Sequence, residues 1–278
     1  MIALLAAAAL AAPMELHTTH QLGVALFPEG VQYMFEVEGR IPLWKSEHFL
    51  LADGHVALIG HAELTPSFPR VGPVLRIAPV AFWDATLKAY GTWYFGAFSS
   101  ILPFDDPEFE ATRLAKRALV REGERTGGWG IRFDAETRLK GKAGPVIVVL
   151  ELQYRRHHVE VPDGDLAYFW EPTEMLNVAA DGEVINRNGY LFFELIKPVK
   201  GTAEVAANDT KLWVGAIGMW QSSPQTGDRN IRVGPIASWK PANGLQVPTL
   251  LIGAQAWVDS NSVPVLPPYT FVAASWAR

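Results

Sequence analysis

The sequence predicts an all-β fold, a single antiparallel up-and-down β-barrel of about 12 strands, with ten as the alternative count. Its composition suits strands, because 10 Trp, 7 Tyr and 14 Phe accompany 24 Gly and 20 Pro spread along 278 residues. Long segments alternate apolar and polar residues, which is the periodicity of a strand with two different faces. Turn-rich stretches recur at spacings too short for domain linkers, so one domain is expected.

The clearest element is a hairpin between Gly130 and Arg155. From Gly130 to Lys140, apolar residues alternate with an entirely charged set on the opposite face. The turn sequence GKAG follows at residues 141–144, and the alternation resumes from Val146 to Arg155. Each strand has about the 9–11 residues that cross a bilayer at a tilt, more than the roughly 5 or 6 of a common soluble strand.

Ten further segments repeat this pattern and are predicted strands. In chain order they are Thr18–Leu26, Gln32–Ile41, His55–Thr65, Val71–Val80, Ala85–Phe95, Gly189–Ile196, Lys211–Trp220, Ile231–Trp239, Val247–Trp257 and Tyr269–Arg278. With the N-terminus on the periplasmic side, the long connections 96–127, 159–188, 221–229 and 259–267 fall outside, as outer-membrane barrels prefer. Segment 43–54 is the exception, a long connection on the periplasmic side.

The first 13 residues, MIALLAAAALAAP, form the longest apolar run. Small residues at its end suit a signal-peptidase cut, so residues 1–13 are predicted to be a signal peptide with the cleavage site left open. Residues 14–278 would then form the barrel. No Lys or Arg precedes the run, which leaves a truncated start or a buried N-terminal helix as alternatives.

Alternation by itself does not tell which face of a barrel points inward. A barrel of twelve strands is wide enough to leave a lumen, so one compact core would not hold the apolar half of every strand, whereas lipid outside the wall would cover it. The predicted lumen-facing residues are Glu36, Glu38, Arg40, His61, Glu63, Arg76, Lys88, Arg132, Asp134, Glu136, Arg138, Lys140, Glu151, Arg155, Glu194 and Arg232. Aromatic residues near strand ends are predicted to lie at the two membrane interfaces, namely Trp44, Trp93, Trp220, Trp239, Trp257, Tyr269 and Trp276.

The alternating hairpins and Trp276 near the end make the chain similar to bacterial outer-membrane β-barrel proteins, over nearly all of residues 14–278. IPLWKSEHFLLADG at 41–54 and the segment 71–96 also resemble a poorly characterised group of barrels from predatory and gliding soil bacteria. The resemblance implies an outer-membrane location, with membrane lipid and the barrel assembly machinery as partners and other envelope proteins as candidates. Many such barrels end on an aromatic residue, whereas here Ala277 and Arg278 follow Trp276.

Catalytic and metal-binding signals are weak. The chain has no Cys, which excludes thiolate sites and disulfides. His17 with His20, and His157 with His158, have no partnering carboxylate motif, and the common catalytic motifs are absent. No cofactor and no metal is expected. The net charge of -5 makes nucleic acid an unlikely partner.

The predicted function is a porin-like channel for small hydrophilic solutes. The predicted lumen face interleaves both signs of charge, which suits a solvated pore and also a barrel whose walls are closed by ion pairs. The alternative is therefore a non-conducting barrel scaffold in an envelope-spanning or surface machine, such as one for motility or secretion. A lipid-modifying barrel enzyme is the weaker third hypothesis, and no catalytic residue is predicted.

Overall fold

Twelve long strands form the wall of the protein. The structure, a computed structural model, describes residues 14–26, 29–44, 46–48, 50–95, 103–104, 106, 109, 115, 118, 127–160, 168–171, 174–196, 210–241, 248–261 and 268–277. The wall strands are β1 (Glu15–Leu26), β2 (Glu29–Pro42), β3 (His55–Leu64), β4 (Pro69–Val80), β5 (Trp83–Tyr94), β7 (Gly128–Ala143), β8 (Val146–Val159), β11 (Glu183–Ile196), β12 (Lys211–Ser222), β13 (Arg229–Lys240), β14 (Thr249–Ser260) and β15 (Tyr269–Ala277). The predicted signal peptide, residues 1–13, lies outside the described residues.

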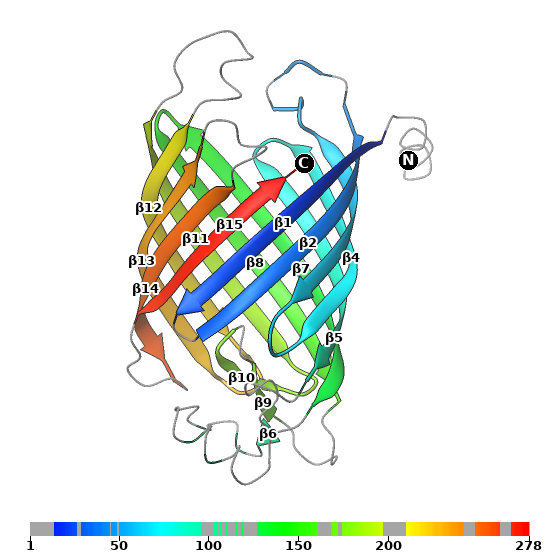
Figure 1. Cartoon of the computed structure of the whole chain (residues 1–278), viewed down its shortest axis with the longest axis vertical. Helices are drawn as coiled ribbons and strands as arrows, with labels where there is room; N and C mark the ends of the chain where they lie inside the picture. The colour runs from blue at the N-terminus through cyan, green and yellow to red at the C-terminus, as the bar shows by residue number, and fades with distance from the viewer. Residues whose placement is uncertain are drawn as a thin grey trace.

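Each wall strand pairs antiparallel with its neighbours, and β1 pairs with β15 to close the barrel (Figure 1). The fold-class prediction is therefore confirmed, with twelve strands and not ten. Every predicted strand segment overlaps one wall strand. Among the described residues no helix has the length and apolar character to cross a membrane.

The two ends of the barrel differ. The start of β1 and the end of β15 lie at one end, here called the terminus end (Figure 1). Segment 43–54 returns to the wall at this end, where Leu43 N–H donates to Gly54 O at 2.8 Å and Trp44 Nε1 donates to Pro79 O at 2.8 Å. The tight turn between β7 and β8 also lies there, with Gly144 at φ +58° in the left-handed region that glycine favours. The opposite end is called the loop end.

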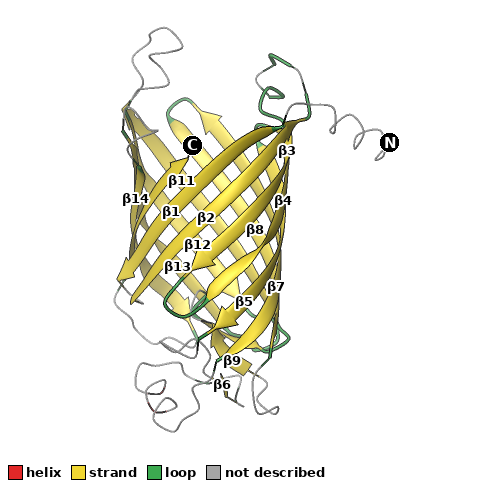
Figure 2. Cartoon of the chain, turned by 45° about the vertical axis from the view of Figure 1, so that its right-hand side comes forward, coloured by secondary structure: helices red, strands yellow, loops and turns green. Residues whose placement is uncertain are grey.

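A small second sheet lies at the loop end (Figure 2). It consists of β6 (Pro103–Phe104), β9 (Tyr168–Glu171) and β10 (Leu176–Ala179), in the order β10–β9–β6. Both parent segments, 96–127 and 159–188, are predicted to be loops from the sequence, because runs of two to four residues are too short to show a strand period. The pair β9–β10, residues 168–179, is here called the plug hairpin.

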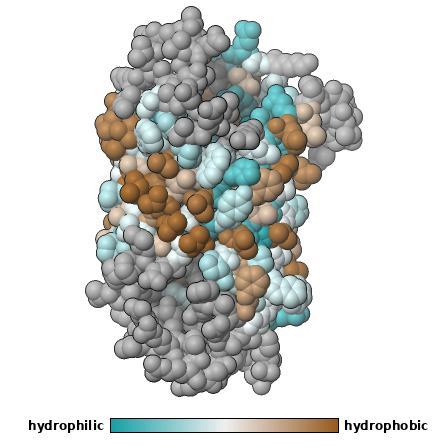
Figure 3. Space-filling model, in the orientation of Figure 1, coloured by the Kyte–Doolittle hydropathy of each residue, from teal (hydrophilic) through white to brown (hydrophobic). Residues whose placement is uncertain are grey.

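The two faces of the wall invert the usual arrangement of a water-soluble protein. On β7, Phe133 is 55% exposed, whereas Arg132 and Asp134 on either side of it are 6% and 3% exposed. Side chains of a strand alternate between faces, so the apolar residues point outward and the charged ones point into the barrel. Figure 3 shows apolar side chains gathered across the middle of the visible face, interrupted by polar ones.

One glycine is required by a close approach of two wall strands. A Cβ atom added to Gly72 on β4 would lie 1.8 Å from the carbonyl oxygen of Ala89 on β5. This contact is with backbone and would be relieved only by separating the two strands.

We expect Gly72→Ala to lower the free energy of unfolding by about 1–3 kcal/mol, measured by urea titration of the detergent-solubilised barrel. Gly60→Ala is the matched control, because nothing lies within 4 Å of a Cβ added at Gly60 on the neighbouring strand. Equal stability of the two variants would show that β4 and β5 do not approach this closely.

Candidate functional site: the lumen and its plug hairpin

Ion pairs connect the inner faces of β5 and β7. Arg132 Nε and Nη2 donate to the two carboxylate oxygens of Asp134 at 2.8 and 2.7 Å. Lys88 Nζ donates to Glu136 Oε2 at 2.7 Å, and Arg138 Nη2 donates to Glu136 Oε1 at 2.7 Å. The inner charges of these strands are thus neutralised by their neighbours, and this part of the wall is cross-linked from within.

A second group of inner charges belongs to β2, β3 and β4. Glu38 accepts bonds from Arg40 Nε at 2.8 Å and from Arg76 Nη1 at 3.3 Å. The buried carboxylate is therefore shared by two guanidinium groups from different strands.

His61 lies among carboxylates within the same wall. Its Nδ1 is 3.0 Å from Glu36 Oε1, and its Nε2 is 3.8 Å from Glu63 Oε2. Arg70 Nη1 donates to the same Glu63 oxygen at 3.0 Å. These contacts describe a wall network in which the histidine and the arginine share acidic partners.

The pairing of the strands places every predicted lumen residue on the same face of the wall as these inward side chains. The remaining members and their partners are Lys140 with Asp84, Arg138 with Glu151, Arg155 with Asp134, Glu194 with Lys142, and Arg232 with Gln221. Water reaches this face unevenly. The side chains of Lys142 and Lys140, near the terminus end, are 54% and 43% exposed, whereas Arg70 and Arg232, near the loop end, are each 2% exposed.

The other side of the lumen carries fewer charges. Ile217 on β12 and Ile236 on β13 are buried inside the barrel, and Tyr190 and Phe192 of β11 stack with ring planes 8° apart. Near the loop end the same strands carry buried polar side chains, among them Gln221. The inner charges therefore concentrate on β2 to β8, whereas β11 to β15 combine apolar, aromatic and polar side chains.

The plug hairpin enters the loop end of this lumen, and Glu174 at its turn contacts the wall. The Glu174 carboxylate forms an ion pair with Arg155 of β8. It also accepts bonds from Asn186 Nδ2 of β11 at 3.1 Å and Gln221 Nε2 of β12 at 2.5 Å. Asn230 Nδ2 of β13 donates to the Glu174 carbonyl at 2.9 Å. Four wall strands thus converge on one residue of the hairpin.

Further polar bonds hold the hairpin to the neighbouring loops. Asn177 N–H donates to Asp228 Oδ2 at 2.7 Å, and Thr226 Oγ1 donates to Asn177 O at 2.8 Å, both from the connection between β12 and β13. Asn177 Nδ2 also donates to Phe109 O at 2.7 Å. The turn itself carries Met175 at φ +57°. A non-glycine residue in this region is uncommon and is held there by surrounding contacts.

Apolar contacts complete the plug. Phe104, Trp170 and Met175 form a buried cluster, against which Trp257 of β14 and Tyr269 of β15 pack from the wall. The interface prediction for Trp257 and Tyr269 is therefore wrong. Both residues share the inner face with the buried Gln255, and the sequence pattern missed this because aromatic residues suit a membrane interface and a plug equally well.

The other predicted interface aromatics lie on the outside. Trp93 and Trp220 are close to the loop end of their strands, and Trp239 and Trp276 are close to the terminus end. Trp44 is 41% exposed in the segment that returns to the wall beside Pro79. Two tryptophans absent from the prediction, Trp83 and Trp129, also occupy exposed outer positions at opposite ends of β5 and β7.

The histidine pairs noted in the sequence do not form joint sites. On β1, the partner of His17 in β2 is the inward Glu38, whereas that of His20 is the outward Phe35, so the two histidines lie on opposite faces. His157 is buried and its neighbour His158 is exposed. Within the described ranges, no group of three or more His, Asp or Glu side chains has the arrangement to hold a metal ion.

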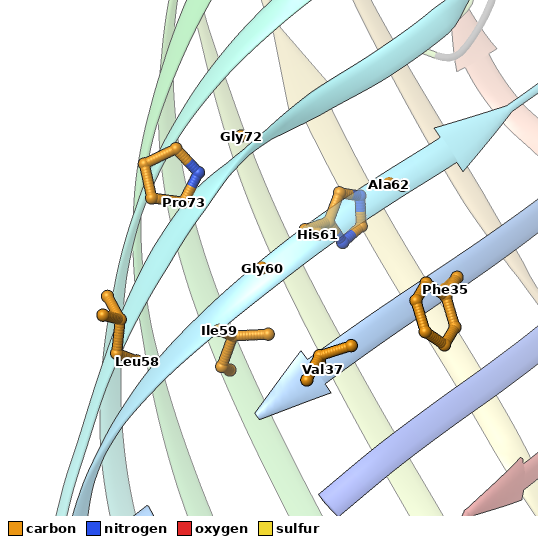
Figure 4. Close-up of a pocket in the computed structure, with 9 residues that line it drawn as sticks. All are labelled: Phe35, Val37, Leu58, Ile59, Gly60, His61, Ala62, Gly72 and Pro73. Carbon is orange, nitrogen blue, oxygen red and sulfur yellow. The ribbon is translucent and has the colours of Figure 1, made fainter. Parts of the chain in front are cut away.

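The outer wall carries a shallow groove of about 480 Å³ (Figure 4). Gly60, Ala62, Gly72 and Pro73 leave a depression between Phe35, Val37 and Leu58. Its walls are apolar and it opens away from the lumen, so in a bilayer acyl chains would fill it.

Sequence reasoning missed several residues of the site. Arg70, Asn186, Gln221 and Asn230 lie just beyond the predicted strand ends, where alternation merges into turn residues. Glu174 lies within a segment predicted to be a loop. The signal that would have found the first four is the continuation of the inward parity for one to three more residues at the loop end of each strand.

No family model matches the chain, and no curated protein matches its sequence. Solved structures of several outer-membrane proteins have a similar outline. The KdgM porin matches with a TM-score of 0.43 at 8% identity, covering 94% of this chain and 97% of that one. The β domain of the Bordetella autotransporter BrkA matches with a TM-score of 0.40 at 10% identity over 94% and 96%. The outer-membrane protein OmpT of Vibrio cholerae, in its trimer form, gives 0.34 at 8% identity over 96% and 99%.

These low scores assign the chain to no family. The resemblance to barrels of predatory and gliding bacteria stays a prediction.

Proposed function

We propose that the chain is an outer-membrane β-barrel that acts as a porin-like channel for small hydrophilic solutes, with the plug hairpin closing its loop end. The membrane assignment is supported by the height of the outer apolar band. Trp83 and Trp93 are ten residues apart on β5. At about 3.3 Å per residue and a tilt of about 40°, this separation corresponds to about 25 Å, the height of the apolar band of outer-membrane barrels.

A channel is supported by the polar inner face. Lys140 and Lys142 are in contact with water near the terminus end, and paired charges continue along β7 toward the loop end. A wall of fixed charges of both signs stabilises ions and polar solutes that have lost part of their hydration. The plug hairpin is the one described element that crosses this path near the loop end.

The observation that carries the proposal is the polar attachment of the plug hairpin around a single carboxylate. Glu174 is bound by side chains and not by a continuous strand ladder with the wall. Side-chain bonds of this kind exchange with water at modest net free energy, whereas a β-ladder would fix the hairpin permanently. The part of the hairpin that acts as a gate is therefore the turn around Glu174, whereas its strands are packed against the wall through Phe169, Leu176 and Val178.

We expect Glu174→Ala to raise the conductance of purified protein in planar lipid bilayers at least several-fold, because Arg155, Asn186 and Gln221 lose their shared partner. Glu47→Ala, which removes an exposed carboxylate outside the lumen, is the control and should behave as the wild type. Folding of each variant is checked by heat-modifiable migration on denaturing gels.

The second candidate is a non-conducting scaffold. It is favoured by the apolar packing of Phe104, Trp170 and Met175 against the wall, which resists displacement. If neither the wild type nor the folded Glu174→Ala variant conducts ions across planar bilayers, the scaffold is supported and the channel is contradicted.

A further inference from the structure

We infer that the wall site holding Glu174 is a binding site for the carboxylate of a small ring-bearing organic acid, and that Glu174 occupies this site as a built-in competitor. The inference rests on the proposed channel function and deepens it, because it names the class of solute that the gate recognises. The donors of the site, Arg155, Asn186 and Gln221, come from three different wall strands and are here called the carboxylate cradle.

The cradle is oriented by the wall and not by the plug hairpin. Gln221 Oε1 accepts a bond from Arg232 Nη2 at 2.7 Å, which leaves the amide Nε2 pointing at Glu174. Asn186 Nδ2 also donates to Gln153 Oε1 at 3.1 Å, and this second bond holds the amide independently of the hairpin. Donors that are held by their own neighbours persist as a site after the occupant leaves.

The charge balance of the cradle favours an anion. Arg155 lies 3.7 Å from Asp134, but both oxygens of Asp134 already accept bonds from Arg132. Among the carboxylates of the wall, Asp134 is thus shared by two buried guanidinium groups, and the hairpin supplies further negative charge through Glu174 and the buried Glu171. When Glu174 withdraws, the buried guanidinium group of Arg155 loses its carboxylate partner. Binding of an external carboxylate would restore that pairing.

The surroundings of the cradle select a ring. Met175, next to Glu174, packs with Trp170 against Trp257 and Tyr269 of the wall. If the hairpin withdraws, these two wall rings border the vacated volume next to the cradle. Aromatic faces of this kind stack well on a flat ring, so a carboxylate attached to a ring repeats both contacts that the hairpin makes.

Unused hydrogen-bonding groups lie in the same wall. Gln255 is 0% exposed, and among the described residues neither its amide oxygen nor its amide nitrogen has a hydrogen-bond partner. The indole N–H of Trp257 also has none. Buried polar groups are nearly always paired, so Gln255 and Trp257 have hydrogen-bonding capacity that a polar ligand at this wall could use.

The test is calorimetric titration of folded, detergent-solubilised barrel with benzoate. We expect Glu174→Ala to bind benzoate at least tenfold more tightly than the wild type does, because a tethered carboxylate competes at high effective concentration. Benzyl alcohol, which has the ring without the charge, should not bind. Glu47→Ala should match the wild type, since its cradle remains occupied.

The double variant Glu174→Ala/Arg155→Met removes both charges together and should lose benzoate binding while still showing heat-modifiable migration. Equal benzoate binding by the wild type, Glu174→Ala and the double variant would overturn the inference, as would a folded Glu174→Ala barrel that binds none. These outcomes are separate from the channel test. If the Glu174→Ala barrel conducts ions but does not bind benzoate, the cradle is refuted and the channel is not. If the barrel binds benzoate but does not conduct ions, the channel is refuted and the cradle is not.

Discussion

Replacing Asp134 with alanine is expected to lower the free energy of unfolding by about 3–5 kcal/mol, because it removes one side of a buried charge pair. Asp134 accepts both bonds of Arg132 and lies 3.7 Å from Arg155. The variant leaves two buried guanidinium groups with no carboxylate of the wall between them. Urea titration of the detergent-solubilised barrel, followed by tryptophan fluorescence, measures the loss.

Asp181→Ala is the control for this variant. Asp181 pairs with Arg156 at 3.5 Å, and their side chains are 58% and 57% exposed. Such a surface pair contributes about 0–1 kcal/mol, so the control should unfold close to the wild type. A similar, small effect at both positions would mean that water reaches Asp134 and that the loop end of the lumen is not closed as described.

Replacing Leu87 with arginine is expected to lower the stability of the barrel in lipid bilayers by about 2–4 kcal/mol. Leu87 is 57% exposed on the outer face of β5 and lies between Trp83 and Trp93, near the middle of the apolar band. A charge there must lose its hydration in the hydrocarbon region. Reversible folding into phospholipid vesicles, titrated with guanidinium chloride, measures the difference.

Leu139→Arg is the matched control for position along the wall. Leu139 is 50% exposed on β7 but pairs with Trp83, at the edge of the band. A charge near the interface costs about 0–1 kcal/mol because the side chain reaches water. If Leu87→Arg and Leu139→Arg lower the stability equally little, no bilayer surrounds the wall, and the proposed location is contradicted.

The wall of the barrel could be predicted from the sequence because successive side chains of a strand point to opposite faces of the sheet. The side chains of β7 alternate between two faces, so the positions of Arg132, Asp134 and Glu136 relative to Phe133 are set by residue number alone. A slip of one residue would put the charged set of this strand on the outer face, which makes the register strongly determined. Strand ends were less well predicted, and this is why Arg70 and Gln221 were missed.

The partners of these residues could not be predicted in the same way. Arg155 was expected on the inner face, but its ion pair with Glu174 joins a wall strand to a segment whose own pattern reads as a loop. Trp257 and Tyr269 are residue types that also suit a membrane interface, and the strand register together with the plug hairpin beside them shows that they face inward. Contacts between distant segments depend on how the loops fold. Short loop segments show no regular alternation of apolar and polar residues from which that fold could be predicted.

The sequence by itself determined the class of the fold, the order and alternation of its strands, and the face on which the charged residues of the strand interiors lie, because these are local properties of an extended chain. The tertiary structure alone decided that the plug hairpin reaches the wall at the loop end and that Glu174 meets Arg155, Asn186 and Gln221 there. The physical reason is that an inserted hairpin is held by many weak contacts from separate strands, none of which leaves a pattern in the sequence of its partners.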